Sequence, residues 1–209
     1  MKFFFLSMTS MLALLTNGCR GADNLEALVI GNANIERIYD VVGATEDDAT
    51  VVRRRASPIA GGYRVVEEEV SRSSTSPKNG MPLGGVEYHL QVDPAKGIAT
   101  KVQMGSRQIL VKAPLIAQSE PWTNTVQVAR QGGTDKATET CKISGARAIP
   151  VSGDKRLQVT TECVTKFDGT ELVSTTDYVE SVGMTRQIVQ IKQGSTLSRA
   201  LQIQLRGPY

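Results

Sequence analysis

The sequence has few of the side chains from which most enzyme active sites are built. Among its 209 residues there is one histidine, His89, and the strand pattern described below places it on a polar face. No G-x-S-x-G segment is present, which excludes the nucleophile elbow of α/β-hydrolases. No glycine-rich loop opens a helix, so nucleotide phosphates have no evident site. We therefore expect no catalytic residue and no cofactor.

Strong charge and aromatic clusters are also lacking. Lys and Arg number 24 and Asp and Glu 21, which gives a formal net charge of only +3. So weak a balance does not predict nucleic-acid binding. Aromatic residues make up 5% of the chain, which argues against stacking sites for carbohydrate.

Long apolar runs are absent except at the N-terminus. Lys2 precedes the apolar stretch Phe3–Leu15, and Gly18-Cys19 follows, a pattern typical of an export signal. The stretch is shorter than the about 20 residues that a membrane-spanning helix needs. Gly18-Cys19 resembles the bacterial lipobox, in which Cys19 would be lipidated, although Thr16 stands where that pattern has Leu. Ordinary signal-peptidase cleavage at the same bond, or an uncleaved anchor, is the alternative.

The cysteine count agrees with export. If Cys19 carries a lipid, Cys141 and Cys163 remain as an even pair, suited to a structural disulfide in an oxidising compartment. In the chain-entropy model such a bond is worth roughly 3 kcal/mol. Two cysteines and one histidine are too few ligands for a zinc site, so we expect no metal.

Apolar and polar residues alternate along most of the chain. The segment Val86–Asp93 alternates without a break, and Ile98–Met104, Ile109–Ala113 and Leu201–Leu205 repeat the pattern. This period of two is the mark of half-buried antiparallel strands. Turn-like clusters separate the runs, among them Asp93–Gly97, Gln131–Gly133, Ser152–Asp154, Asp168-Gly169 and Gln193–Ser195. The chain is therefore predicted to be all-β, with a single curved antiparallel sheet or half-barrel of roughly ten strands.

The expected organisation is one domain. Residues 1–18 would be the signal peptide, 19–27 a short tether, and 28–209 a single β-rich domain. A short N-terminal helix around Asn24–Val42 is one interpretation, and a strand from about Ile35 is the other. Residues 71–85 are rich in Ser, Pro, Gly and Asn and predict a flexible loop.

One basic and one acidic run stand out. Arg53–Arg55 and Glu67–Glu69 are interpreted as two solvated strand faces that could lie near each other. On a strand Glu67 and Glu69 would share a face, and Glu68 would not.

Four motifs stand in a fixed order along the chain: Leu28–Asn32 with Tyr39, Ala113–Leu115 with Trp122, Ile149–Gly153 with Cys163, and Tyr178–Arg186. In order and spacing they resemble a broad group of uncharacterised bacterial envelope proteins, many of them predicted lipoproteins. The resemblance implies a curved antiparallel sheet akin to the half-barrels of the LolA, LolB and LppX lipoprotein carriers. It brings no catalytic residue, and with Arg20 after the cysteine it implies outer-membrane sorting.

Two aromatic residues are the candidates for core or ligand contacts. Trp122, the one tryptophan, is interpreted as packing in the sheet core, with ligand stacking as the alternative, and Tyr178 is the second candidate. Gly183 is predicted to occupy a bulge or a positive-φ position where a side chain would clash.

The functional hypothesis is a non-enzymatic lipoprotein of the bacterial envelope, in the periplasm or outer membrane, held to the membrane by Cys19. Its sheet would bind an apolar ligand or a protein partner. A lipid carrier needs a concave face that is apolar and free of charges. A secreted or periplasmic hydrolase would instead need His89 or a carboxylate pair buried in a cleft. A component of a cell-surface or secretion assembly would show an exposed apolar patch or an unpaired strand edge.

Overall fold

The structure is a computed structural model that describes residues 25–43, 49–72, 85–117, 119–130 and 133–207. The expected signal peptide, Cys19 and most of the predicted loop at 71–85 lie outside these residues. Within the described residues, no helix combines the length and the apolar character that a membrane crossing requires.

The described chain is almost entirely β-structure. One short helix, α2 (Leu25–Val29), comes first, and twelve strands follow. The strands are β1 (Arg37–Val42), β2 (Thr50–Ile59), β3 (Gly62–Arg72), β4 (Val86–Asp93), β5 (Ile98–Gln103), β6 (Ser106–Lys112), β7 (Trp122–Arg130), β8 (Gly133–Val151), β9 (Asp154–Phe167), β10 (Thr170–Val179), β11 (Gly183–Gln193) and β12 (Thr196–Leu205). Both N-terminal interpretations therefore hold in part, because a short helix precedes a strand that begins at Arg37.

All twelve strands belong to one antiparallel sheet, in the order β6-β5-β4-β3-β2-β1-β12-β11-β10-β9-β8-β7. Neighbours in the sheet are neighbours in the chain, except that β1 pairs with β12. The all-β prediction is confirmed, with twelve strands in place of roughly ten. The sheet also curls further than a half-barrel, because its edge strands β6 and β7 come into contact.

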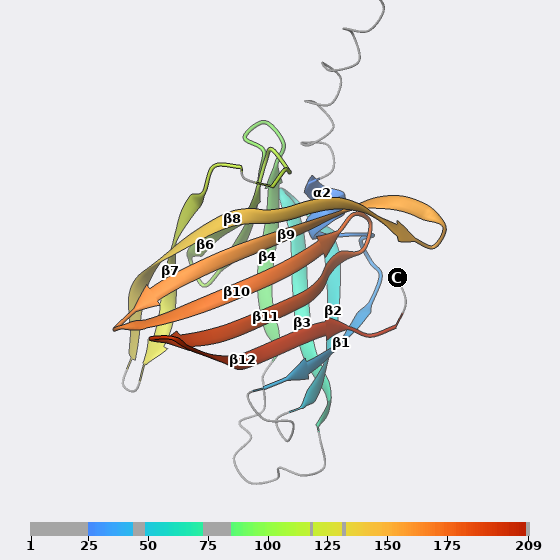
Figure 1. The fold of residues 1–209 in the computed structure, drawn as a ribbon. Coiled ribbons are helices and arrows are strands. Elements are labelled where there is room, and N and C mark those ends of the chain that lie inside the picture. The colour runs from blue at the N-terminus through green and yellow to red at the C-terminus, as the bar shows by residue number, and fades with distance from the viewer. Residues whose placement is uncertain (1–24, 44–48, 73–84, 118, 131–132, 208–209) are drawn as a thin grey trace, which may run out of the picture.

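The curled sheet forms two walls. In Figure 1, β8–β12 run across the front, β7 descends at the left edge, and β2–β6 stand behind them at a steep angle. The single cross-connection, β1 on β12, joins the two walls on one side. The interior between the walls is where side chains of one face of every strand meet.

Tight two-residue turns set the register of several hairpins. Met104-Gly105, Ser152-Gly153 and Asp168-Gly169 join consecutive strands, and both residues of each pair have positive φ. This is the backbone of the type I′ turn, whose twist matches that of the flanking strands. The last two turns fall where they were predicted. Met104 was expected on the apolar face of a strand, but it lies in a turn and is 94% exposed.

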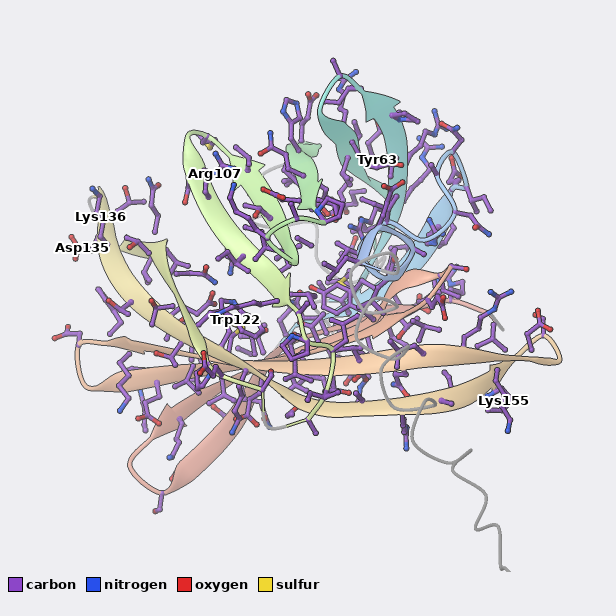
Figure 2. The ribbon with its side chains drawn as sticks, turned by 90° about the horizontal axis from the view of Figure 1, so that it is seen from above. Tyr63, Arg107, Trp122, Asp135, Lys136 and Lys155 are labelled. Carbon is purple, nitrogen blue, oxygen red and sulfur yellow. A yellow bond between two sulfur atoms is a disulfide. The ribbon has the colours of Figure 1, made fainter. Side chains whose placement is uncertain are left out.

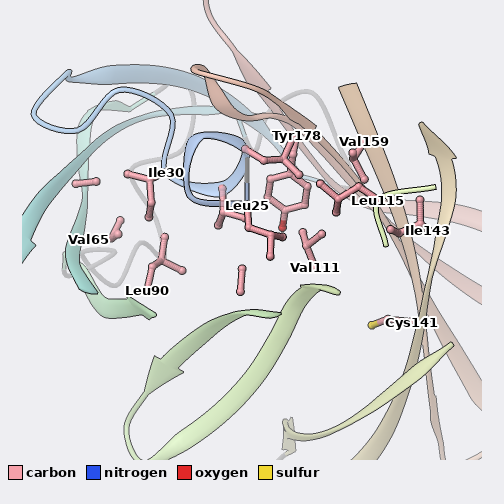
Figure 3. Close-up of a cluster of buried hydrophobic side chains, with 14 of the residues drawn as sticks. Leu25, Ile30, Val65, Leu90, Val111, Leu115, Cys141, Ile143, Val159 and Tyr178 are labelled. Atoms are coloured by element: carbon pink, nitrogen blue, oxygen red, sulfur yellow. The ribbon is translucent and has the colours of Figure 1, made fainter. Parts of the chain in front are cut away.

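An apolar plug fills one end of the barrel. Leu25, Leu28 and Val29 of α2 are buried, and the helix contacts β5, β9, β10 and β11 (Figure 3). Around them pack apolar side chains of the sheet, including Val65, Leu90, Val111, Val159 and Tyr178. Leu25, which lies within the segment 19–27 predicted as a tether, is completely buried in this plug.

The turn between β10 and β11 is hydrogen-bonded to the helix and to the segment that follows it. The Ser181 N–H donates to the Ala27 carbonyl over 2.8 Å, and the Asn32 N–H donates to the Ser181 carbonyl over 3.1 Å. Gly183 follows with φ of +87°, and a Cβ there would lie 3.2 Å from the Ile30 carbonyl oxygen. The prediction that Gly183 avoids both strain and a clash is confirmed.

A pair of glycine substitutions separates these two effects. Gly183→Ala should lower the free energy of unfolding by about 1–3 kcal/mol for the positive φ, plus a further loss because the helix must move. Gly169→Ala, at φ of +76° with nothing within 4 Å of its Cβ, should show the first effect alone. Urea unfolding of both variants measures the difference, and equal losses would contradict a close packing of α2 on this turn.

Candidate functional site

The barrel interior changes from apolar to charged within two residues along the same strands. Toward α2 the inward side chains are apolar, and at the next inward position they are polar. These pairs are Ala56 and Arg54 on β2, Val65 and Glu67 on β3, Leu90 and Tyr88 on β4, Ala99 and Lys101 on β5, and Val159 and Thr161 on β9. These polar residues, together with Ile109, Leu110, Met184 and Ile203, line a partly open cavity of about 150 Å³.

The two charged runs meet across the ladder between β2 and β3. Arg53 is paired with Glu68, and Arg54 with Glu67. Because successive side chains alternate, Arg53 and Glu68 point outward and form an exposed ion pair of 2.7 Å. Arg54 and Glu67 point inward and lie 3.5 Å apart (Nε to Oε1). The runs are near each other as predicted, but the expectation that both are solvated is wrong for Arg54, which is buried.

Tyr88 links this inner ion pair to a second cation. Its hydroxyl donates to Glu67 Oε1 over 2.7 Å, and burial raises the pKa of the phenol well above its usual value, so the hydroxyl stays protonated. Lys101 Nζ lies over the Tyr88 ring, 4.3 Å from its centroid, in a cation–π contact. Burial lowers the pKa of the Lys101 ammonium, and the charge of Glu67 opposes this effect.

Glu139 provides the second inward carboxylate. It is 7% exposed, and its Oε2 accepts hydrogen bonds from Gln108 Nε2 at 2.8 Å and Asn124 Nδ2 at 2.9 Å. Gln108 reaches the interior because β6 has one extra residue, Leu110, between the rungs at Val111 and Ile109. This bulge reverses the alternation, so that Val111 and Gln108 both face inward.

The disulfide lies beside this carboxylate. Cys141 and Cys163 are direct ladder partners on β8 and β9 and are joined by a bond of 2.16 Å. With Glu139 they form a cluster of potential metal ligands within the described part of the chain. Since the two sulfurs are bonded to each other, the cluster offers no thiolate to a metal.

The remaining candidates from the sequence lie apart from the cavity or at its border. His89 is exposed on the outer face of β4, between Arg64 and Val102. Tyr178 is 5% exposed and lies between the apolar plug and the cavity, where burial raises the pKa of its phenol. Trp122 is 5% exposed and packs in the core cluster.

Side chains of β7 close part of the barrel seam. Asn124 presents its side-chain amide to the main chain of β6 like a peptide group, because Oδ1 accepts from the Ile109 N–H at 2.9 Å and Nδ2 donates to the Ile109 carbonyl at 3.0 Å. The Trp122 indole N–H donates to the same carbonyl over 3.0 Å. Among the described residues no backbone ladder joins β6 to β7, so these bonds replace one.

Beyond Asn124 the seam opens into a groove. In Figure 2 the hairpin that carries Arg107 and the strand end near Asp135 and Lys136 diverge from the region of Trp122. The groove has a volume of about 280 Å³. Its lining consists of Lys101, Gln103, Met104, Ser106 and Gln108 on one side and Val126 and Gln127 on the other. We call this the seam groove.

Comparison with known proteins identifies the fold and no family. No protein-family model matches the chain, and no curated protein matches it. Among solved structures, the chain is similar to a Bacteroides fragilis protein that is inferred to be exported and is described as having a YmcC-like fold. The TM-score is 0.51 at 11% identity, over 85% of this chain and 96% of the other. The likeness extends to the fold alone, and the motif resemblance to envelope proteins stays a prediction.

Two neighbouring arginines test the burial of the inner ion pair. Arg54→Met should lower the free energy of unfolding by about 3 kcal/mol, because it removes the buried ion-pair partner of the Glu67 carboxylate. Arg53→Met, on the same strand and also opposite a glutamate, should leave stability nearly unchanged because that pair is exposed. Chemical denaturation of both variants is the measurement, and similar losses would mean that Arg54 reaches solvent.

Asn124→Ala should loosen the seam. It removes the partner of the Ile109 N–H and one donor to Glu139, at a cost of about 2 kcal/mol. Trp122, the one tryptophan of the chain, reports the change as a red shift of its fluorescence. Thr123→Ala, an exposed position on the same strand, is the control. An unshifted spectrum in Asn124→Ala would contradict the role of this amide in closing the barrel.

Proposed function

We propose that this chain is an exported, non-enzymatic protein of the bacterial envelope that is anchored by a lipid on Cys19 and binds a protein partner. The N-terminal sequence supports export, and the solved structure with the same fold is described as that of a protein inferred to be exported. A disulfide between Cys141 and Cys163 suits an oxidising compartment. Outer-membrane placement rests on Arg20 and the lipobox resemblance.

The composition of the barrel interior is the observation that favours a protein partner over an apolar ligand. The cavity contains Arg54, Glu67, Lys101 and Glu139, and an apolar chain would have to displace their hydrogen-bonding surroundings. Its volume of about 150 Å³ is below the range of roughly 300–1,000 Å³ that small-molecule pockets occupy. The apolar part of the interior is already filled by α2. Binding capacity is therefore expected on the outside and at the edges of the sheet.

The hydrolase alternative gains no support from the arrangement of His89. That hypothesis required His89 or a carboxylate pair in a cleft, and His89 is exposed on an outer strand face. Glu67 and Glu139 do line the cavity, where Glu67 is held by Arg54 and the Tyr88 hydroxyl, and Glu139 by the amides of Gln108 and Asn124. By contrast, a component of a surface or secretion assembly was expected to show an exposed apolar patch or an unpaired strand edge. Within the described residues, β6 and β7 each offer such an edge along the seam groove. The proposal therefore includes membership of such an assembly.

Mass spectrometry of the full chain produced in a bacterium tests anchoring and cargo together. We expect the denatured mass to match a triacylated chain that begins at Cys19 with one disulfide, and Cys19→Ala to remain unlipidated and to leave the membrane fraction. Native spectra of the Cys19→Ala protein, which has no anchor lipid, should show no bound lipid. A stoichiometric apolar ligand in those spectra would overturn the proposal in favour of a carrier.

A further inference from the structure

We infer that the seam groove is the docking site of an extended, acidic segment of the partner protein, which adds to the sheet as a strand between β6 and β7. This inference rests on the proposed function and names its binding surface. Strand addition of this kind uses main-chain hydrogen bonds for affinity and side-chain pockets for specificity.

The first argument is the state of the two edges. An antiparallel strand directs alternate peptide groups to its two sides, so an edge strand presents donors and acceptors that lack a ladder partner. Across the seam between β6 and β7, the side chains of Trp122 and Asn124 form hydrogen bonds to one peptide group of β6, that of Ile109. The groove lies further along, between Ser106 and Val126, where an incoming backbone would find two edges at once.

The second argument is the lining of the seam groove. Met104 at the β5–β6 turn is 94% exposed, and Val126 lies across from it, so the groove has an apolar contact on each wall. Gln103, Gln108 and Gln127 add neutral amides that can both donate and accept. Such a lining suits a peptide strand better than an acyl chain, because an acyl chain would leave the amides of the groove without hydrogen-bond partners.

The third argument is charge. The segment Ile98–Lys112, which forms β5 and β6, contains Lys101, Arg107 and Lys112 and no acidic residue, a formal charge of +3. The part of β7 from Trp122 to Val128 has no charged residue. Lys101 lines the groove itself. A segment with glutamate or aspartate at alternate positions would complement this edge, and Coulomb attraction would also speed its association.

The same charge disfavours a second copy of the chain as the occupant. Edge-to-edge pairing of two β6 strands would bring Arg107 and Lys112 of both copies close together. Like charges directly opposite across a ladder are destabilising. An acidic partner strand does not bring like charges together at this edge.

Peptide binding tests the class of partner. The probe is a fluorescein-labelled octapeptide of alternating glutamate and valine, with a lysine–valine octapeptide of the same length as its counterpart. We expect fluorescence anisotropy to show saturable binding of the acidic peptide to the full chain, weaker at high salt. The basic peptide should bind at least about tenfold more weakly. Equal binding of the two peptides, or none of the acidic one, would overturn the inference.

Two matched variants test the place. Met104→Glu puts a negative charge at the groove, and Ile59→Glu puts one at the end of β2, where Ile59 is 40% exposed beside another hairpin turn. We expect Met104→Glu to weaken binding of the acidic peptide by about tenfold and Ile59→Glu to leave it unchanged. Both positions are exposed, so neither variant should affect folding, which circular dichroism verifies. Equal effects of the two variants would place the peptide elsewhere.

Crosslinking in cells separates a wrong site from a wrong function. A photoreactive amino acid at position 104 should form an adduct with another protein, and the same residue at position 59 should not. An adduct at 59 alone would overturn the seam groove and leave the proposed partner function intact. An adduct between two copies of the chain at 104 would replace the acidic partner by self-association. Adducts at neither position, together with a bound lipid in native spectra, would defeat the proposed function itself.

Discussion

The hydrogen bonds from Asn124 and Trp122 to the peptide group of Ile109 hold the curled sheet closed, so that one of its faces becomes the interior of a barrel. A twelve-stranded sheet that stopped short of this contact would leave the same side chains on an open concave surface in water. With the seam held, Arg54, Glu139 and Thr161 are buried. Each must then find partners within the protein, since an unpaired charge in such a site is strongly unfavourable. The polar network of the interior is therefore a consequence of closure.

The division of that interior into two zones follows from the strand period and the position of one helix. Inward positions near α2 hold Val65, Leu90 and Val159 and bury its leucines. Two residues along, the same strands carry Glu67, Tyr88 and Thr161 around the cavity. An apolar cargo space would need the opposite arrangement, with an empty apolar zone. Here the apolar zone is full, and the remaining space is lined by charged and neutral polar side chains with a few apolar ones.

Much of the fold could be predicted from the sequence, because alternation and turn residues are local signals. Val86–Asp93 is a strand with His89 outward, and Ser152-Gly153 and Asp168-Gly169 are turns. What could not be predicted depends on pairing between distant strands. Because side chains alternate between the two faces of a strand, at least one residue of the run Arg53–Arg55 must face the interior. Only the pairing with β3, which sets Arg54 opposite Glu67, identifies Arg54 as that residue. The roles of Asn124 and Gln108 likewise require the curl of the sheet and the bulge in β6.

Incomplete closure also explains why the interaction surface is expected at one place. A barrel with a continuous ladder has no edges, and sheet proteins commonly protect the edges that remain. In this chain the protection is local, since it extends to one peptide group of β6 and is followed by a groove. Cations on β5 and β6 discourage pairing with an identical or basic edge while leaving the backbone groups accessible. The cations of this edge repel a second copy of the same edge and attract an acidic strand, and the exposed Met104 adds an apolar contact. The edge is therefore selective for its partner, as a docking site must be.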